Sequence, residues 1–392
     1  MRGTIRAEFA GFIAAIDEGY YDAADLDVTL VETPAGADPV AAGSATDGPE
    51  FTVAWVPAVL AARGSGRSDL VDIGQLFQRS GTLSISRRDD DITGPAAFRD
   101  KTVGMFGFGD GIEVLAAAKK AGLEPDTDFK VATQDADLDG PLPRRLDVAQ
   151  TTIYDGYARV LESRNPQTNA QYTTSDLNVI EWYDEGTALL QDAIFSRASW
   201  LAIDGNEAIA ERFLKASFQG WIYCRDHAAD CVQGTIAAGE RPVVSTGSAG
   251  ASPVPGIASQ RPSATPKPLS SAAASGKPGT SAKPAASTAP PSPPPSVAPS
   301  ERPTFGPGHT AWSMNEVNAL VWPAPMGIGI VDPSVWQHTI DVCLAAGAIP
   351  SATPADALRT DLAKDAIAEL SDLDTSGLSF AKSQIEITPD GE

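Results

Sequence analysis

Residue types that mark several classes of protein are scarce in this sequence. Its 392 residues include only three cysteines and three histidines, too few and too scattered for a disulfide scaffold or a metal cluster. Lysine and arginine total 29 against 51 acidic residues, a formal net charge of −22. Because nucleic acids and anionic membranes are bound through clustered cations, this balance excludes both as expected partners. No apolar run reaches membrane-spanning length, while 42% hydrophobic content supplies a sizeable core.

The three cysteines do not identify a compartment. Cys224 and Cys231 are seven residues apart in a predicted helix, so their Cα atoms would lie about 10 Å apart at the helical rise per residue. That separation is too long for a direct disulfide. We expect buried, inert thiols here and at Cys343.

A tract without acidic residues interrupts the chain. Residues 241–300 contain no Asp or Glu and are dominated by Ser, Ala and Pro, a composition that cannot bury enough apolar surface to offset the entropy of ordering. We therefore predict a disordered Pro/Ser/Ala-rich insertion at residues 241–308. A wall-spanning or partner-binding segment is the alternative, although Pro-rich tracts more often act as spacers.

Outside the tract, strand-like and helix-like stretches alternate, which predicts an α/β protein with mostly parallel sheets. The predicted strands are residues 28–31, 51–54, 70–73, 102–105, 129–132 and 179–181. The predicted helices are residues 9–18, 112–121, 155–162, 206–218, 315–320 and 333–346.

The most informative stretch is the opening. An apolar helical pattern at residues 7–15 ends at a glycine–aromatic turn and leads into the β-rich residues 28–31. This opening resembles the first βα unit of the solute-binding proteins of ABC importers related to thiamine-pyrimidine, sulfonate and nitrate uptake. Six later blocks resemble the same family in the same order: residues 51–57, 74–82, 101–104, 152–155, 190–192 and 312–318.

The resemblance implies a two-lobed periplasmic-binding-protein type II fold with a ligand cleft between the lobes. Lobe 1 would comprise residues 1–86, 196–240 and 309–392, and lobe 2 residues 87–195. An ABC transporter permease would be the partner, and the location would be extracytoplasmic, in the periplasm or at the cell surface. The first residues carry no secretory signal, and only residues 1–6 stand where the family's first strand usually lies, so we expect a trimmed or misplaced start.

Four candidate cleft residues come from lobe 1. Glu8 begins the first helix, where a carboxylate is favoured in any soluble protein, so capping is an equal alternative to ligand binding. Trp55 follows a strand and would either stack on a planar ligand or pack in the core. Arg79 and Ser80 would lie at the mouth of the first crossing between the lobes, as a cation and a hydrogen-bonding hydroxyl, unless they form an ordinary turn.

A glycine-rich turn supplies the first candidates from lobe 2. It follows a strand and opens a helix, so its glycines permit a ligand close to free backbone N–H groups. The glycine spacing does not match the dinucleotide fingerprint, which excludes nucleotide binding. The expected ligand contacts in this turn are Phe106, Gly109, Asp110 and Glu113.

Three further candidates complete the expected cleft. Tyr154 and Asp155 resemble the family's Tyr-Asn-Glu block, but Asp155 replaces the asparagine and Gly156 the glutamate. The missing glutamate puts the family's usual ligand in doubt. Asp192 lies near the return crossing, where hydrogen bonding within the hinge is the alternative.

The candidates make the expected cleft acidic, and Arg79 is its one obvious cation. Carboxylates attract amines and repel sulfonate or nitrate, so we expect a small planar amine-bearing ligand such as a thiamine-related pyrimidine. A sulfonate- or nitrate-like anion is the alternative, as is a pyrimidine-biosynthesis enzyme of the same fold. That enzyme needs a cleft histidine and a Cys-rich run, whereas the histidines here fall late in lobe 1 or at the tract edge. We therefore expect a monomeric binding protein without catalysis, cofactor or metal.

Overall fold

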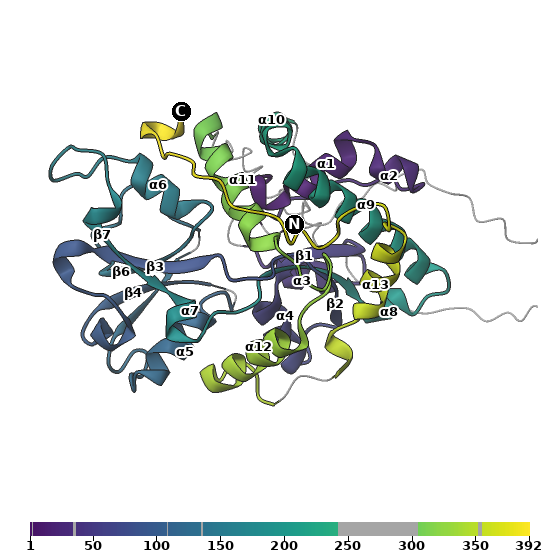
Figure 1. Ribbon diagram of the computed structural model, residues 1–392. Coiled ribbons are helices and arrows are strands. Elements are labelled where there is room, and N and C mark those ends of the chain that lie inside the picture. The colour runs from purple at the N-terminus through teal and green to yellow at the C-terminus, as the bar shows by residue number, and fades with distance from the viewer. Residues whose placement is uncertain (2, 34–36, 108, 135, 242–304, 352–354) are drawn as a thin grey trace, which may run out of the picture. The chain divides into compact units, whose positions relative to one another are not determined.

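The structure is a computed structural model that describes residues 1, 3–33, 37–107, 109–134, 136–241, 305–351 and 355–392. These residues belong to one compact unit, formed by Met1–Thr246 and Arg302–Glu392 (Figure 1). The predicted insertion at residues 241–308 lies largely outside the described residues. Its predicted end is two residues too late, because helix α11 already begins at Pro307.

The first sheet has three strands in the order β1-β8-β2, and the central strand β8 runs antiparallel to both neighbours. Its strands are β1 (Phe51–Trp55), β2 (Leu70–Gln75) and β8 (Asp192–Arg197). The helices in this part of the chain are α1 (Ala10–Asp17), α2 (Tyr20–Ala23), α3 (Pro39–Ser44), α4 (Val56–Gly64), α8 (Ala198–Leu201), α9 (Asn206–Asp226), α10 (Ala228–Gly239), α11 (Pro307–Val321), α12 (Pro333–Ala346) and α13 (Thr360–Ala368). No helix among the described residues is long and apolar enough to cross a membrane.

The second sheet has five strands in the order β5-β4-β6-β3-β7 (Figure 1). Strand β4 is parallel to β5 and β6, while β3 is antiparallel to β6 and β7. Its strands are β3 (Thr82–Arg87), β4 (Thr102–Phe106), β5 (Lys130–Gln134), β6 (Val148–Thr152) and β7 (Leu177–Glu181). The accompanying helices are α5 (Ile112–Lys120), α6 (Gly156–Glu162) and α7 (Trp182–Glu185).

The chain passes from the first sheet to the second between β2 and β3, and returns between α7 and β8. The predicted lobe boundaries at residues 86/87 and 195/196 fall inside β3 and β8. The strand pairings place each change of sheet several residues earlier. Two segments therefore cross between the sheets.

Five of the six predicted strands are found, but two expectations about the sheets are wrong. Residues 28–31 form no strand, because within the described residues no neighbouring strand pairs with them. The sheets are not mostly parallel either, since only the pairings of β4 are parallel among the described strands. The antiparallel pairs arise because the crossing strands β3 and β8 enter their sheets in the direction opposite to their neighbours.

Two glycines fix the position of the first helix. A Cβ on Gly11 would lie 2.3 Å from the Trp221 ring, and a Cβ on Gly220 would lie 1.9 Å from the Gly11 carbonyl oxygen. Helices α1 and α9 therefore approach as closely as glycine permits. This close crossing holds the start of α1, and with it Glu8, in place.

A disulfide joins Cys224 to Cys231, with the two Cα atoms 5.4 Å apart. The prediction that these residues are too distant to bridge is wrong, because it assumed one continuous helix. His227 has φ −131° and ψ 51°, which ends α9 and starts α10 in a new direction. The corner brings the two sulfur atoms together and ties the two helices, while Cys343 stays free and buried.

A buried acid in β2 opposes the stability of the first sheet. Asp72 is fully buried, and one of its carboxyl oxygens accepts a hydrogen bond from the Gly74 amide at 2.9 Å. The other oxygen has no partner among the described residues. Burial raises the pKa of Asp72 to about 8, so the carboxyl is protonated at neutral pH.

We expect Asp72→Asn to stabilise the protein above pH 4. The wild-type unfolding free energy should fall as pH rises from about 4, where the unfolded acid ionises, to about 8, where the folded acid ionises. The amide cannot ionise, so the variant should gain up to roughly 5 kcal/mol over wild type by pH 8. Urea unfolding between pH 4 and pH 9 measures this difference. Asp22→Asn, at an exposed position, is the control, and an equal pH slope in all three proteins would contradict the assignment.

Candidate functional site

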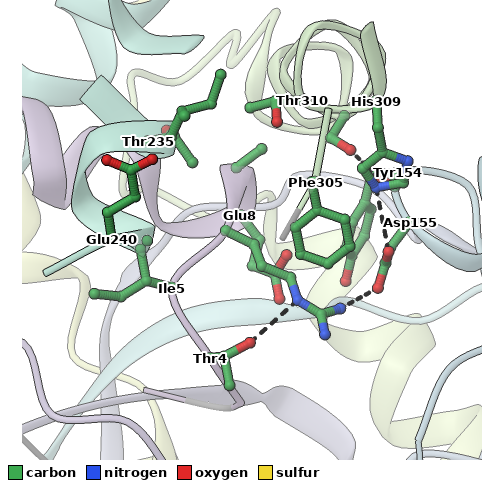
Figure 2. Close-up of a pocket in the computed structure, with 15 residues that line it drawn as sticks. Thr4, Ile5, Glu8, Tyr154, Asp155, Thr235, Glu240, Phe305, His309 and Thr310 are labelled. Atoms are coloured by element: carbon green, nitrogen blue, oxygen red, sulfur yellow. Dashed lines mark hydrogen bonds and ion pairs between the residues drawn. The ribbon is translucent and has the colours of Figure 1, made fainter. Parts of the chain in front are cut away.

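A cavity of about 90 Å³ lies where the segment before α1, the turn between β6 and α6, and helices α10 and α11 meet (Figure 2). Glu8 sits in the 3₁₀ turn Ala7–Phe9 that leads into α1, and Tyr154 and Asp155 follow β6. Elements associated with both sheets therefore contribute to one site. The lining residues are Thr4, Ile5, Arg6, Ala7, Glu8, Tyr154, Asp155, Thr235, Ile236, Gly239, Glu240, Phe305, His309, Thr310 and Ser313.

Asp155 is the electrostatic centre of the cavity. It is buried and pairs with the guanidinium of Arg6, which comes from the segment before α1. It also accepts from Arg159 Nε at 2.8 Å, and His309 Nε2 lies 3.3 Å from its carboxylate. Three cationic groups from three separate elements thus converge on one carboxylate. An isolated buried carboxylate would be very costly, and these partners offset the cost of burying it.

His309 is held between two carboxylates. Its Nδ1 lies 2.9 Å from Glu162, while its Nε2 faces Asp155. Burial alone would lower the pKa of the imidazole, but hydrogen bonds to Asp155 and Glu162 outweigh it and raise the pKa above 6.5. A protonated ring donates from both nitrogens, which suits this pair of acceptors.

The two arginines that pair with Asp155 respond differently to their surroundings. Burial lowers the pKa of Arg6, but the carboxylates of Asp155 and Glu8 more than compensate and raise it overall. Burial and the nearby Arg6 charge lower the pKa of Arg159 to about 10. Both remain charged at neutral pH.

The departure from the family's Tyr-Asn-Glu block has a steric explanation. A Cβ on Gly156 would lie 2.2 Å from Asp137 and 2.4 Å from the Thr151 hydroxyl. Asp137 accepts from the Thr151 hydroxyl at 2.6 Å and from the Thr152 and Gly156 amides at 3.0 and 3.2 Å. The partly buried Asp137 therefore occupies the space that a side chain at position 156 would need, and its hydrogen bonds hold the β6–α6 turn.

Two aromatic side chains line the cavity. Tyr154 is buried and meets Phe77 edge-on, with ring centroids 5.9 Å apart. The Phe305 ring stacks on His309 at 4.8 Å between centroids. Figure 2 shows Phe305 on the side of the cavity where Tyr154 and Asp155 lie, with Glu8 on its other side.

Trp55, Phe106 and Asp192 form a second group, apart from the residues that line the cavity. The Trp55 indole N–H donates to Asp192 at 3.3 Å, and its ring meets Phe106 edge-on at 6.1 Å. All three are buried. Gly109 stands close by, since a Cβ there would be 3.4 Å from the Ala58 Cα at the start of α4. Asp110 contributes its carbonyl, which accepts from Gln150 Nε2 at 2.9 Å.

Glu113 and Ser80 lie at the crossings between the sheets instead of lining the cavity. Glu113 is buried and accepts hydrogen bonds from the Thr82 hydroxyl and, at 2.7 Å, from the Leu189 amide. Gln191 donates to Ser80 at 3.2 Å and to Thr82 at 3.0 Å. Both crossing segments are thereby tied into one polar network. Burial raises the pKa of Glu113 to about 7.

Arg79 is not the cleft cation that the sequence predicted. Its guanidinium donates to the carbonyls of Trp322 at 3.2 Å and Pro323 at 3.0 Å, just beyond the end of α11. Cations are favoured at a helix carboxyl end, where carbonyls lack partners. Arg79 therefore anchors α11, and Arg6 and His309 supply the positive charge in the cavity.

The sequence interpretation missed Arg6, His309 and Phe305. The expectation that the histidines lie away from the cleft is wrong for His309, which lines the cavity from the first turns of α11. The start of α11 resembled the end of the Pro-rich tract in composition, so its helical signal was overlooked. Proline at the first helical position after Gly306 was a signal that could have located it.

The comparisons with known proteins identify the family. The family described as NMT1/THI5 like matches residues 6–230, more than half of the chain. The chain belongs to this family. No curated protein matches the sequence.

Solved structures agree in fold. A protein of Bordetella bronchiseptica RB50 aligns at 11% identity with a TM-score of 0.56, over 94% of this chain and 97% of that chain. A putative periplasmic sulfonate-binding protein from Methylobacillus flagellatus KT aligns at 10% identity and TM-score 0.53, over 92% and 89% of the two chains. The ligand-binding component of an ABC-type import system from Staphylococcus aureus aligns at 8% and 0.50, over 93% and 97%. The predicted α/β periplasmic-binding-protein type II fold is confirmed.

We expect His309→Gln to destabilise the protein in a pH-dependent way. Because the folded-state pKa is raised above 6.5, the imidazolium stabilises the fold fully below that pH and loses its effect as pH rises through the folded pKa. The variant should lose about 1–3 kcal/mol of unfolding free energy at pH 6 and less at pH 9. Denaturant titrations at both pH values measure this, with exposed His338→Gln as control. A loss that is equal at both pH values would refute a charged role.

Proposed function

We propose that the protein is an extracytoplasmic solute-binding protein of an ABC importer, binding a small planar solute in the cavity at Asp155. The observation that carries this proposal is the composition of the cavity wall. Its polar groups converge from the segment before α1, the β6–α6 turn and α11. Family membership and fold are consistent with it, since ligands of such α/β folds bind at the carboxyl ends of strands where the chain changes sheet.

The compartment is supported by cysteine chemistry. The disulfide between Cys224 and Cys231 ties the corner between α9 and α10, and α10 carries the cavity residues Thr235 and Ile236. Disulfides persist mainly in oxidising compartments outside the cytoplasm. The partners of the proposed role are a small solute and a permease, with the binding protein acting as a monomer.

The proposed solute is a planar, amine-bearing compound such as a thiamine-related pyrimidine. Tyr154 offers an aromatic surface, while Glu8, Asp155 and Glu240 place carboxylates on the wall. An exocyclic amine can donate to a carboxylate, and a ring nitrogen can accept from Arg6. These are the groups that an aminopyrimidine needs at its edge.

A sulfonate- or nitrate-like anion is the second candidate, and it is favoured by Arg6 and His309 in the cavity wall. Both cations already bind carboxylates, so an anion would have to displace Asp155 or Glu162 from them. Such a displacement leaves a buried carboxylate without its partner and is costly. The enzyme alternative gains a cavity histidine, but both ring nitrogens of His309 face carboxylates.

We expect a planar aminopyrimidine to raise the melting temperature of the protein, because a ligand that binds only the folded state stabilises it. The panel is hydroxymethyl- and formylamino-pyrimidines, thiamine, taurine, nitrate and riboflavin. Tyr154→Ala should weaken the preferred pyrimidine by about 1–3 kcal/mol, the scale lost when a stacking surface leaves a desolvated pocket. Tyr172→Ala, which removes a buried tyrosine outside the cavity, should leave affinity unchanged.

Tightest binding of taurine or nitrate would overturn the pyrimidine assignment. If that binding is lost in Arg6→Gln and retained in Tyr154→Ala, the site takes an anion. Calorimetric titration of the three proteins decides between the two ligand classes.

A further inference from the structure

The cavity at Asp155 is smaller than the sites that hold planar ligands. Its volume is about 90 Å³, whereas ligand pockets are typically roughly 300–1,000 Å³. A neighbouring hollow of about 250 Å³ shares two lining residues with it, Phe305 and His309. The two spaces are therefore adjacent, and Phe305 and His309 belong to the walls of both.

The Phe305 ring is surrounded by groups that recognise aromatic rings. Arg159 Cζ lies 4.2 Å and Arg6 Cζ 5.1 Å from its centroid, and His309 stacks on it. A guanidinium over a ring is attracted by the negative π face. These contacts are those that a bound aromatic solute would seek.

Phe305 can leave this position without unwinding a helix. Gly306 is the residue that precedes α11, and Pro307 is the first helical residue. The Gly306 carbonyl accepts from the Thr310 amide at 3.1 Å, which holds the helix start independently of Phe305. Within the described residues, no main-chain hydrogen bond fixes Phe305 itself. The ring is therefore attached just outside a rigid element.

We propose that Phe305 occupies the subsite of the solute's aromatic ring, and that the solute carries a neutral ring which replaces Phe305 against Arg159, Arg6 and His309. This inference rests on the proposed solute-binding function and narrows its ligand class. A positively charged ring is excluded from this subsite, because two guanidiniums face it. Departure of Phe305 also joins the two spaces into one of the size that a planar ligand needs.

The alternative role for Phe305 is a fixed wall that the solute contacts. The two roles predict opposite effects of truncation. If the solute must displace the ring, the competent state is only partly populated, and removal of the ring raises apparent affinity. If the ring is a wall, its removal deletes a contact and lowers affinity.

The test uses Phe305→Ala and Phe305→Leu in the full chain. Calorimetric titration with hydroxymethylpyrimidine should show at least about fivefold tighter binding to Phe305→Ala than to wild type. Taurine, which has no ring, should show no gain. Phenol should raise the melting temperature of Phe305→Ala more than that of wild type, and N-methylpyridinium should not. Phe305→Leu should gain less, because leucine refills part of the space.

The matched control is Phe380→Ala, which removes a half-buried phenylalanine that lines neither space. Equal or weaker pyrimidine binding by Phe305→Ala would overturn the subsite assignment while leaving the proposed function intact. If Phe305→Ala binds phenol but no variant binds any solute of the panel, the result would support the ring subsite and count against the proposed function. A phenol response as large in Phe380→Ala as in Phe305→Ala would overturn the subsite.

Discussion

The burial of the Asp155 carboxylate is the constraint on which the candidate site depends. A charged group in this position requires partners, and the chain supplies Arg6, Arg159 and His309 from three separate elements. Each of these partners is therefore held in place by its interaction with the Asp155 carboxylate. The same interaction ties the segment before α1 to the β6–α6 turn and to α11, so the electrostatics of the site and the arrangement of its walls have a common cause.

Local patterns in the sequence predicted the elements that local chemistry determines. Strands β1, β2, β4 and β7 carry apolar and β-branched residues bounded by turn signals, and they were located. The segment at residues 28–31 shows the same pattern without forming a strand, and within the described residues no strand pairs with it. The prediction of one continuous helix over Cys224 and Cys231 is wrong because the chain changes direction at a single residue, His227.

The charges of the site could not be predicted from an inventory of residues. Arg6 and Asp155 are separated by 149 positions, and no local pattern indicates that they pair. A count of carboxylates alone predicted an acidic cleft. In the structure, cationic groups pair with Asp155, and Glu113 lies at the crossings between the sheets. Glu8, Tyr154 and Asp155 line the cavity. The resemblance to the family could indicate their positions, because it compares sequence segments, but it could not indicate the side chains that they contact.

The Arg6–Asp155 pair also limits what the cavity can accept. A solute with a strong charge of its own would compete for one member of the pair and weaken the contacts that offset the burial of Asp155. A neutral planar solute can instead hydrogen-bond at the edge of the intact pair and stack beside it. Because the pair joins elements associated with both sheets, a solute that leaves it intact adds its own contacts to an existing bridge.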